Sequence, residues 1–245
     1  MKILAIIPAR GGSQGIKKKN IRNFAGMPLI AHTIKVAKKS KFINKLVVST
    51  NDLEIAKISK KYGAEIPALR PLEISGSTSK VTDAIFHMLD FLKNNENYIP
   101  DYLVLLQTTS PLRETADVDG AISLLLSNKK DADAVVSVCA TEPLLYIVGE
   151  NKVLKLVSSE DFLKTTNRQE LPKTYKLDGS MVYVIKTEVF LDQKSFLPLR
   201  TFGYVVPRWR AIDLDEPQDF VVGEIIYKNK TKIKNKINKF AQSIY

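Results

Sequence analysis

The feature that most constrains the fold of this chain is an alternation of short apolar runs with amphipathic segments over residues 1–140. The apolar runs have the length and composition of strands: residues 3–7, 46–50, 64–68, 103–106 and 134–138. Apolar side chains at helical spacing predict helices between them: residues 28–39, 53–62, 81–92 and 116–126. Buried strands connected by helices are typical of an α/β fold with a doubly wound, mainly parallel sheet.

The pattern changes after residue 140, where helical signals become sparse. Short apolar runs on either side of Gly149-Glu150-Asn151 predict a β-hairpin. We therefore expect residues 140–178 to be a small insertion within a single domain that spans residues 1–245. Strand character resumes at residues 180–185, 202–206 and 211–214, and Pro217 is expected to open a last helix.

The net charge of +11 is concentrated in one C-terminal segment. Its lysines have no acid among them: Lys228, Lys230, Lys232, Lys234, Lys236 and Lys239. Apolar residues recur there at roughly helical spacing: Ile226, Ile233, Ile237 and Phe240. We therefore expect a basic helix over residues 226–245 whose apolar face is packed and whose lysines are solvated. This explanation argues against a nucleic-acid partner, and the sequence has no zinc-ligand spacing or RNA-recognition signature.

Membrane and secretory signals are absent from the sequence pattern. No apolar run approaches the ~20 residues that a membrane helix needs, and the N-terminal run is too short for a signal peptide. The single cysteine, Cys139, excludes an internal disulfide and suits a reducing compartment. We expect a cytoplasmic protein without a membrane partner.

A glycine-rich, basic loop follows the first predicted strand. It reads Ala-Arg-Gly-Gly-Ser-Gln-Gly at residues 9–15, followed by lysines at 17–19 and by Asn20. Glycines let the backbone curl and aim its N–H groups at one point, and Arg10 and the lysines add positive charge. The loop is therefore suited to a polyphosphate. The alternatives are a solvated surface loop and a dinucleotide-binding turn, although the spacing matches neither that turn nor a P-loop.

Two more polar segments, residues 70–80 and 107–113, also follow predicted strands or precede helices. In an open parallel sheet the ligand crevice lies outside the carboxyl ends of the strands, so we expect these segments to converge with the first loop. The amide of Gln107 and the hydroxyls of Thr108 and Thr109 suit the edge of a base or a sugar. Alone, such a segment is equally typical of a turn.

Paired carboxylates, Asp213 and Asp215, form the other chemical signal. Residues i and i+2 of a strand face the same side, so both carboxylates can reach one cation. Mg²⁺ typically takes one or two carboxylates and completes its shell with water and phosphate oxygens. The alternative is that Asp215 caps the following helix and that Asp213 is solvated.

In several short motifs, the sequence resembles the acylneuraminate cytidylyltransferases, which make CMP-sialic acid and its legionaminic and pseudaminic acid relatives. The resemblance covers about residues 1–225 and rests on five ordered motifs. They are Ile-Pro-Ala-Arg-Gly-Gly-Ser-x-Gly-Ile at 7–16, Gln-x-Thr-Ser-Pro-Leu-Arg at 107–113, Arg-Gln-Glu-Leu at 168–171, Tyr-x-x-Asp-Gly at 175–179 and Ile-Asp-Leu-Asp at 212–215.

The resemblance implies a Rossmann-like nucleotidyltransferase that joins CTP to a nine-carbon 2-keto sugar acid and releases pyrophosphate. It implies catalytic roles for Arg10, Lys19, Arg168, Asp213 and Asp215, the last two holding Mg²⁺ or Mn²⁺. Nucleotide contacts are implied at Arg10, Gly11, Gly12, Ser13, Asn20, Arg70, Ser79 and Gln107, and sugar contacts at Gln107, Arg168, Lys176 and Tyr183. In the family the insertion pairs two subunits, so a homodimer is expected.

This sequence departs from the family pattern at four positions. Gln14 stands where lysine is usual, and Ser77 stands where aspartate is common. Asp178 replaces an asparagine and Lys176 often an arginine, so the motifs do not name the sugar. Two rival functions stay open: a nucleotidyltransferase for another sugar, such as Kdo or a sugar 1-phosphate, and a non-catalytic basic binding protein.

Overall fold

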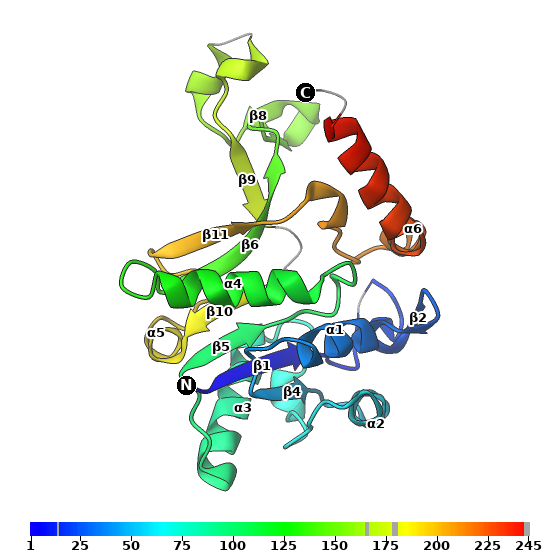
Figure 1. Ribbon diagram of the computed structural model, residues 1–245, viewed down its shortest axis with the longest axis vertical. Helices are drawn as coiled ribbons and strands as arrows, with labels where there is room; N and C mark the ends of the chain where they lie inside the picture. Colours follow the sequence, from blue (N-terminus) through cyan, green and yellow to red (C-terminus); the bar gives the residue numbers. More distant parts are fainter. Residues whose placement is uncertain (14, 165–166, 178–180, 243–245) are drawn as a thin grey trace.

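A seven-stranded sheet forms the centre of the molecule (Figure 1). The computed structural model describes residues 1–13, 15–164, 167–177 and 181–242. The sheet contains β1 (Ile3–Pro8), β4 (Lys45–Ser49), β5 (Tyr102–Leu105), β6 (Ala134–Thr141), β9 (Thr174–Leu177), β10 (Tyr183–Lys186) and β11 (Thr201–Val205). Its order is β11-β6-β10-β5-β1-β4, with β9 paired to β6. Only β9 and β10 run antiparallel to their neighbours, which confirms the predicted mainly parallel sheet.

Side chains of alternating strand residues enter two separate cores. In β1, Ile3, Ala5 and Ile7 join one buried cluster, whereas Leu4 and Ile6 join the other. The first cluster is covered by α1 (Leu29–Lys38), α2 (Leu53–Tyr62) and α4 (Thr115–Ser127). The second is covered by α3 (Val81–Glu96) and α5 (Thr187–Gln193). The nearly continuous apolar strands predicted from the sequence are therefore buried on both faces.

The chain reverses its direction of sheet growth at β1. It passes from β1 to β4 on one side and then returns to place β5 on the other side of β1. Helices α1 and α4, which follow β1 and β5, cover one face of the sheet, whereas α3, which leads back to β5, covers the other. A crevice opens between the carboxyl ends of β1 and β5. This switch point is where the functional segments are expected.

Two predicted strands are wrong. Residues 64–68 make only an isolated bridge between Val47 and Glu65, because Pro67 has no N–H to extend the ladder. Residues 211–214 are not a strand: the segment crosses the carboxyl edge of the sheet, where the Leu214 N–H donates to the carbonyl of Thr109 over 2.9 Å. The buried Leu214 side chain fastens this irregular segment in a third cluster, with Phe24 and Phe220.

Some short elements were not predicted. Among them are α5, β9 and the hairpin of β2 (Asn23–Phe24) and β3 (Met27–Pro28). Strand β3 takes up Pro28, which was expected to open α1. The strand predicted at 180–185 is observed as β10, and its first residue, Ser180, lies outside the described residues.

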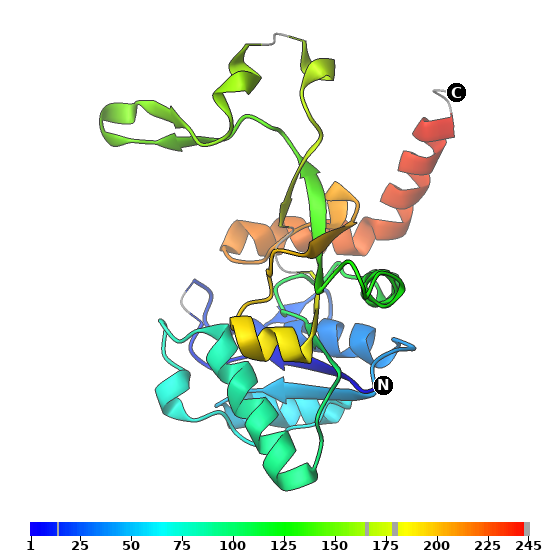
Figure 2. The same cartoon turned by 90° about the vertical axis from the view of Figure 1, so that its left-hand side faces the viewer.

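The predicted insertion projects from the sheet as an arm (Figure 2). The expected hairpin is confirmed as β7 (Tyr146–Val148) and β8 (Leu154–Leu156). The chain returns along β9, which pairs with the end of β6. The hairpin strands expose apolar side chains, among them Ile147 at 57% and Val148 at 67%.

The last helix, α6 (Pro217–Gln242), begins at the expected proline. Its expected packing is wrong for the basic half: Ile237 is 43% and Phe240 69% exposed. Within the described part of the helix only Phe220 and Gly223 are buried. The first turns dock on the β2–β3 hairpin through Phe24, whereas Ile237 and Phe240 in the later turns stay exposed. The apolar period of the sequence could not distinguish these two parts of the helix. The described helices include none that is both long and apolar enough to cross a membrane.

Candidate active site

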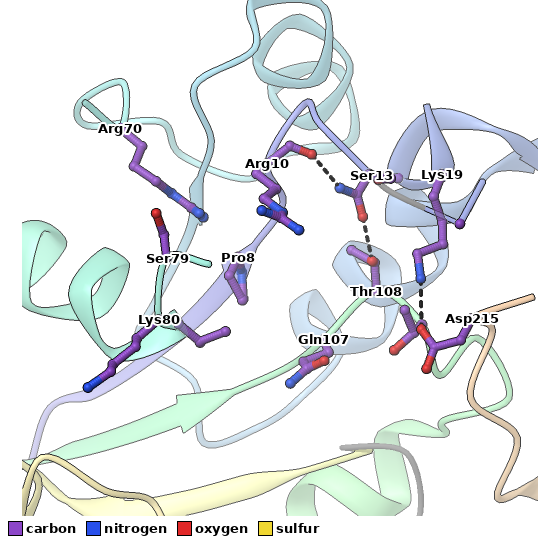
Figure 3. A pocket seen from close by; sticks show the side chains of 14 residues that line it. Pro8, Arg10, Ser13, Lys19, Arg70, Ser79, Lys80, Gln107, Thr108 and Asp215 are labelled. Atoms are coloured by element: carbon purple, nitrogen blue, oxygen red, sulfur yellow. Dashed lines mark hydrogen bonds and ion pairs between the residues drawn. The ribbon is translucent and has the colours of Figure 1, made fainter. Parts of the chain in front are cut away.

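The carboxyl ends of β1 and β5 open onto a cavity of about 420 Å³ (Figure 3). Its lining comes from the first loop, the 70–81 segment, the loop after β5 and the segment before α6. The lining residues are Pro8, Arg10, Ser13, Gly15, Lys19, Asn20, Arg70, Ser79, Lys80, Val81, Gln107, Thr108, Thr109 and Asp215. The structure therefore brings together segments that are far apart in the sequence, as expected.

Two positions in the first loop, Gly11 and Gly15, leave no room for a side chain because other parts of the protein lie close to them. A Cβ at Gly11 would lie 2.8 Å from a carboxylate oxygen of Asp52. A Cβ at Gly15 would lie 2.8 Å from the main-chain carbonyl of Asp215, which cannot move aside as a flexible side chain can. Gly11 and Gly12 do not line the cavity, and the Gly11 N–H already donates to Asn51 over 3.0 Å. In this structure the loop supplies side chains to the cavity more than backbone donors.

Only one lysine of the basic run reaches the cavity. Lys18 turns away and pairs with Glu54 at 2.6 Å, and Lys17 is exposed. The Lys19 ammonium lies 2.9 Å from the Asp215 carboxylate and donates to the Leu214 carbonyl over 2.9 Å. Gln14, which stands where the family usually has a lysine, lies outside the described residues.

Arg10 and Arg70 place two guanidinium groups at the same end of the cavity (Figure 3). Arg70 is only 7% exposed and donates to the hydroxyl and the carbonyl of Ser49 over 3.0 and 2.6 Å. Burial and the neighbouring Arg10 charge lower the pKa of Arg70 to about 10, so it stays charged at neutral pH. Arg10 donates to the carbonyl of Gly76. Among the described residues no carboxylate forms an ion pair with either arginine, so the pair is suited to an anion.

Asn20 connects two sides of the cavity. Its amide donates to the Arg10 carbonyl over 2.9 Å and accepts from the Thr108 hydroxyl over 2.6 Å (Figure 3). Both ends of this buried side chain are therefore engaged with the protein. In this structure Asn20 positions the first loop against the loop after β5.

Arg113 fixes the loop after β5, a role the sequence did not indicate. It is 3% exposed and donates to the carbonyls of Gln107, over 2.6 Å, and Met181. Anchoring the Gln107 main chain leaves its side chain to line the cavity. The only indication of this role in the sequence was that the charged Arg113 directly follows the apolar Pro111 and Leu112.

The two aspartates lie in different environments. Asp215 is on the cavity wall with a 68% exposed side chain, whereas Asp213 has a buried carboxylate oxygen without a partner among the described residues. Burial, reinforced by the charge of Asp215, raises the pKa of Asp213. Asp219, not Asp215, accepts the N–H groups of residues 215 and 216, over 3.0 and 2.7 Å. The helix-cap explanation of Asp215 is therefore wrong.

These carboxylates fit a divalent cation that prefers oxygen ligands. An unpartnered buried carboxylate oxygen costs free energy unless something binds it. No cluster of three or more His, Cys, Asp or Glu side chains occurs among the described residues. A cation at Asp213 and Asp215 would therefore complete its shell with water and ligand oxygens, as Mg²⁺ commonly does.

Two expected sugar-site residues, Lys176 and Tyr183, do not line the cavity of their own chain. Arg168 begins a short 3₁₀ helix, Arg168–Glu170, on the projecting arm, and Lys176 is an exposed residue of β9. Tyr183 lies in the sheet, 8% exposed, with its ring 5.9 Å from that of Phe196. Asp178, the other departure in this region, lies outside the described residues.

An open α/β sheet with a cationic cavity at its switch point is suited to a ligand that carries phosphate groups. A sequence model of the cytidylyltransferase family matches residues 4–237. The chain belongs to the cytidylyltransferase family, as the motifs predicted.

Individual relatives agree with this assignment. The chain is 33% identical to the CMP-N,N'-diacetyllegionaminic acid synthase of Legionella pneumophila, over 91% of this chain and 95% of that protein. It is 30% identical to the pseudaminic acid cytidylyltransferase of Campylobacter jejuni, over 93% of this chain and 97% of that protein. A solved structure of CMP:2-keto-3-deoxy-manno-octonic acid synthetase complexed with CTP matches 94% of this chain and 100% of that one, with a TM-score of 0.67 and 16% identity. That last likeness shows the fold alone.

Proposed function

We propose that this enzyme transfers CMP from CTP to the anomeric oxygen of a nine-carbon 2-keto sugar acid and releases pyrophosphate. Two relatives are named for a legionaminic and for pseudaminic acid, which supports this class of acceptor. The observation that carries the proposal is the convergence of Arg10, Arg70 and Lys19 on one cavity at the switch point of the sheet. We place the activity in the cytoplasm, since Cys139 is the single cysteine and cannot form an internal disulfide.

In the proposed reaction the anomeric oxygen forms a bond to the α-phosphorus of CTP as the bond to the pyrophosphate oxygen breaks. Negative charge grows on the leaving pyrophosphate, and the charges of Arg10, Arg70 and Lys19 would stabilise it. Asn20 joins the first loop to Thr108, and it would thereby hold these cations in a fixed position relative to the rest of the bound nucleotide. Catalysis would then come mainly from positioning and electrostatics.

We propose that Asp213 and Asp215 hold Mg²⁺, or alternatively Mn²⁺, at the Lys19 side of the cavity. The unpartnered oxygen of Asp213 supports this role. When bound, such an ion neutralises phosphate charge and favours deprotonation of the attacking hydroxyl. Lys19 would then exchange its contact with Asp215 for one with a phosphate oxygen, a change that its flexible side chain permits.

We expect two polar side chains of the cavity wall to select the nucleotide base. Gln107 and Ser79 line it, and Arg113 anchors the Gln107 main chain. A site that hydrogen-bonds the exocyclic amine of cytosine leaves buried groups unpaired when uracil takes its place. We therefore expect CTP to support turnover at least ~100-fold better than UTP or GTP.

The test is pyrophosphate release with each nucleotide against sialic, legionaminic, pseudaminic and Kdo acceptors, with the products identified by mass spectrometry. A CMP adduct of one nine-carbon acid is the expected product. Equal turnover with UTP would contradict the cytidylyl assignment, and a preference for Kdo or a sugar 1-phosphate would contradict the acceptor class. No turnover with any acceptor, combined with tight polyanion binding, would favour the non-catalytic alternative.

We propose further that the enzyme is a homodimer in which the arm of one subunit completes the cavity of the other. Three observations support this arrangement: the exposed apolar side chains on β7 and β8, the position of residue 168 on the arm, and the exposure of Lys176 on β9. An isologous pair of arms would bury the apolar hairpins.

Subunit mixing tests the dimer. Arg10→Ala and Arg168→Ala are each expected to be nearly inactive alone. Coexpressed in equal amounts, they should recover about a quarter of wild-type activity, because half of the dimers then carry one intact site. No recovery would mean that Arg168 acts within its own chain, and full activity of Arg168→Ala alone would mean that Arg168 takes no part in the reaction. A monomeric mass in light scattering would exclude the dimer.

A further inference from the structure

Residues 211–215, which carry both candidate metal ligands, have no regular secondary structure of their own. They follow a short 3₁₀ helix, Arg208–Arg210, and precede α6. Near the end of the segment, the Leu214 N–H donates to the Thr109 carbonyl over 2.9 Å. Because no strand ladder supports these residues, the positions of the two carboxylates depend on such individual contacts.

A buried ion pair fixes the start of this segment. Arg210 and Asp117 are only 7% and 3% exposed. The terminal nitrogens of the Arg210 guanidinium, Nη1 and Nη2, donate to the two carboxylate oxygens of Asp117 over 2.5 and 2.9 Å. A bidentate pair of this kind fixes the orientation of the guanidinium as well as its distance from the carboxylate. Since Arg210 directly precedes residue 211, the pair determines where the segment begins.

The same carboxylate also holds the loop after β5. Asp117 accepts the Glu114 N–H over 2.7 Å, as part of the capping box at the start of α4. Glu114 directly follows Arg113, whose guanidinium donates to the Gln107 carbonyl over 2.6 Å. Asp117 therefore connects the segment that carries the candidate metal ligands to the loop that lines the other part of the cavity.

The ion pair lies behind the cavity and does not line it. A buried ion pair is weak evidence for a stabilising role, because the cost of removing two charges from water offsets much of their attraction. Replacing such a pair with apolar groups of similar volume is often neutral for stability. The property that an apolar contact cannot replace is the fixed orientation that a guanidinium and a carboxylate impose on each other.

We propose that Arg210 and Asp117 are positioning residues for the candidate metal site: they hold residues 211–215 where the carboxylates of Asp213 and Asp215 reach the same cation. This role rests on the proposed function. Neither positioning residue belongs to the five motifs that indicated the family. Without the pair, both metal ligands are still present, but their segment is held only at its Leu214 end. The cation should then bind more weakly although the protein stays folded.

The decisive variant is Arg210→Met/Asp117→Asn. It removes both buried charges together, and the side-chain oxygen of asparagine can still accept the Glu114 N–H. We expect the dissociation constant for Mn²⁺, measured by electron paramagnetic resonance of the free ion, to rise about 10- to 100-fold, the usual loss when a group that orients a metal ligand is removed. The Mg²⁺ concentration for half-maximal turnover should rise in parallel. The melting temperature should stay close to that of the wild type.

A conservative variant separates positioning from stability. Arg210→Lys keeps the charge next to Asp117 but cannot form two parallel bonds, so it should fold normally and still lose part of the Mn²⁺ affinity. If it folds normally and binds Mn²⁺ as the wild type does, the guanidinium geometry has no role in the metal site. In otherwise wild-type protein, Asp213→Asn should remove the same Mn²⁺ binding, which assigns that binding to this site.

The matched control is a second bidentate pair, between Arg200 and Asp133, with bonds of 2.8 and 2.7 Å. It lies just before β6, at the amino edge of the sheet and away from the cavity. Arg200→Met/Asp133→Asn should leave Mn²⁺ binding unchanged, and an equal loss there would overturn the positioning role. So would wild-type Mn²⁺ affinity in the Arg210→Met/Asp117→Asn variant. Wild-type turnover without any divalent ion would instead overturn the metal site itself, and this role with it.

Discussion

Asp213→Asn and Asp215→Asn are each expected to lower turnover by at least ~100-fold, the usual loss when one charge-stabilising group is removed from a reacting centre. Asparagine keeps the size and an oxygen acceptor but removes the negative charge that a divalent cation requires. Raising Mg²⁺ or supplying Mn²⁺ should restore part of the activity. The double variant should be hardly worse than the worse single one, because the two carboxylates act as a unit. The measurement is pyrophosphate release over a Mg²⁺ titration.

The stabilities of the two variants should differ. Because burial raises the pKa of Asp213 above its ordinary value of 3.8, its charged form is disfavoured in the folded state. Below pH 3.8 the carboxyl is protonated in both the folded and the unfolded state, so stability is not affected. Stability falls as the pH rises from 3.8 to the folded-state pKa, and the full loss is present at neutral pH. Without metal, Asp213→Asn should therefore melt higher than the wild type at about pH 7, and the difference should shrink towards pH 4.

Asp219→Ala is the matched control for this pair. Asp219 accepts the N–H groups at the start of α6, so its loss should cost about 1 kcal/mol of stability and little turnover. Near-native activity of Asp215→Asn at limiting Mg²⁺, or a turnover loss in Asp219→Ala as large as in Asp215→Asn, would contradict the metal assignment.

Arg10→Ala is expected to lower turnover by at least ~100-fold while the melting temperature changes little. The guanidinium lies at the cavity beside the buried Arg70 and contacts only the Gly76 carbonyl among the described residues. The main-chain carbonyl of Arg10, which accepts from Asn20, is kept in the variant, so the loop should retain its position.

Lys18→Ala is the control within the same loop. It removes the same charge, but Lys18 points away from the cavity to an exposed pair with Glu54. Exposed pairs of this kind contribute little to stability, and turnover should be unchanged. If Lys18→Ala lost as much activity as Arg10→Ala, the loop would act through its net charge and not through the placement of Arg10. A fully active Arg10→Ala would exclude the loop from phosphate binding.

Local sequence patterns were sufficient for most of the fold. Strands buried on both faces and amphipathic helices depend on residues a few positions apart, and these predictions are confirmed. The place of the ligand cavity also followed, because the carboxyl ends of parallel strands must meet at one edge. Three of the five family motifs, at 7–16, 107–113 and 212–215, contain residues that surround this edge.

Tertiary contacts decided what the motifs could not. Residues 211–215 look like a strand by composition, yet the burial of Leu214 and the bond to Thr109 hold them across the sheet edge. Three adjacent lysines look equivalent, but Glu54 on α2 draws Lys18 away and Asp215 draws Lys19 in. The period of α6 shows that it has an apolar stripe, and only the assembled chain shows that Ile237 and Phe240 on that stripe are 43% and 69% exposed. For residues 211–215 and for the lysines, the deciding partner lies far away in the sequence, so no local pattern predicts it.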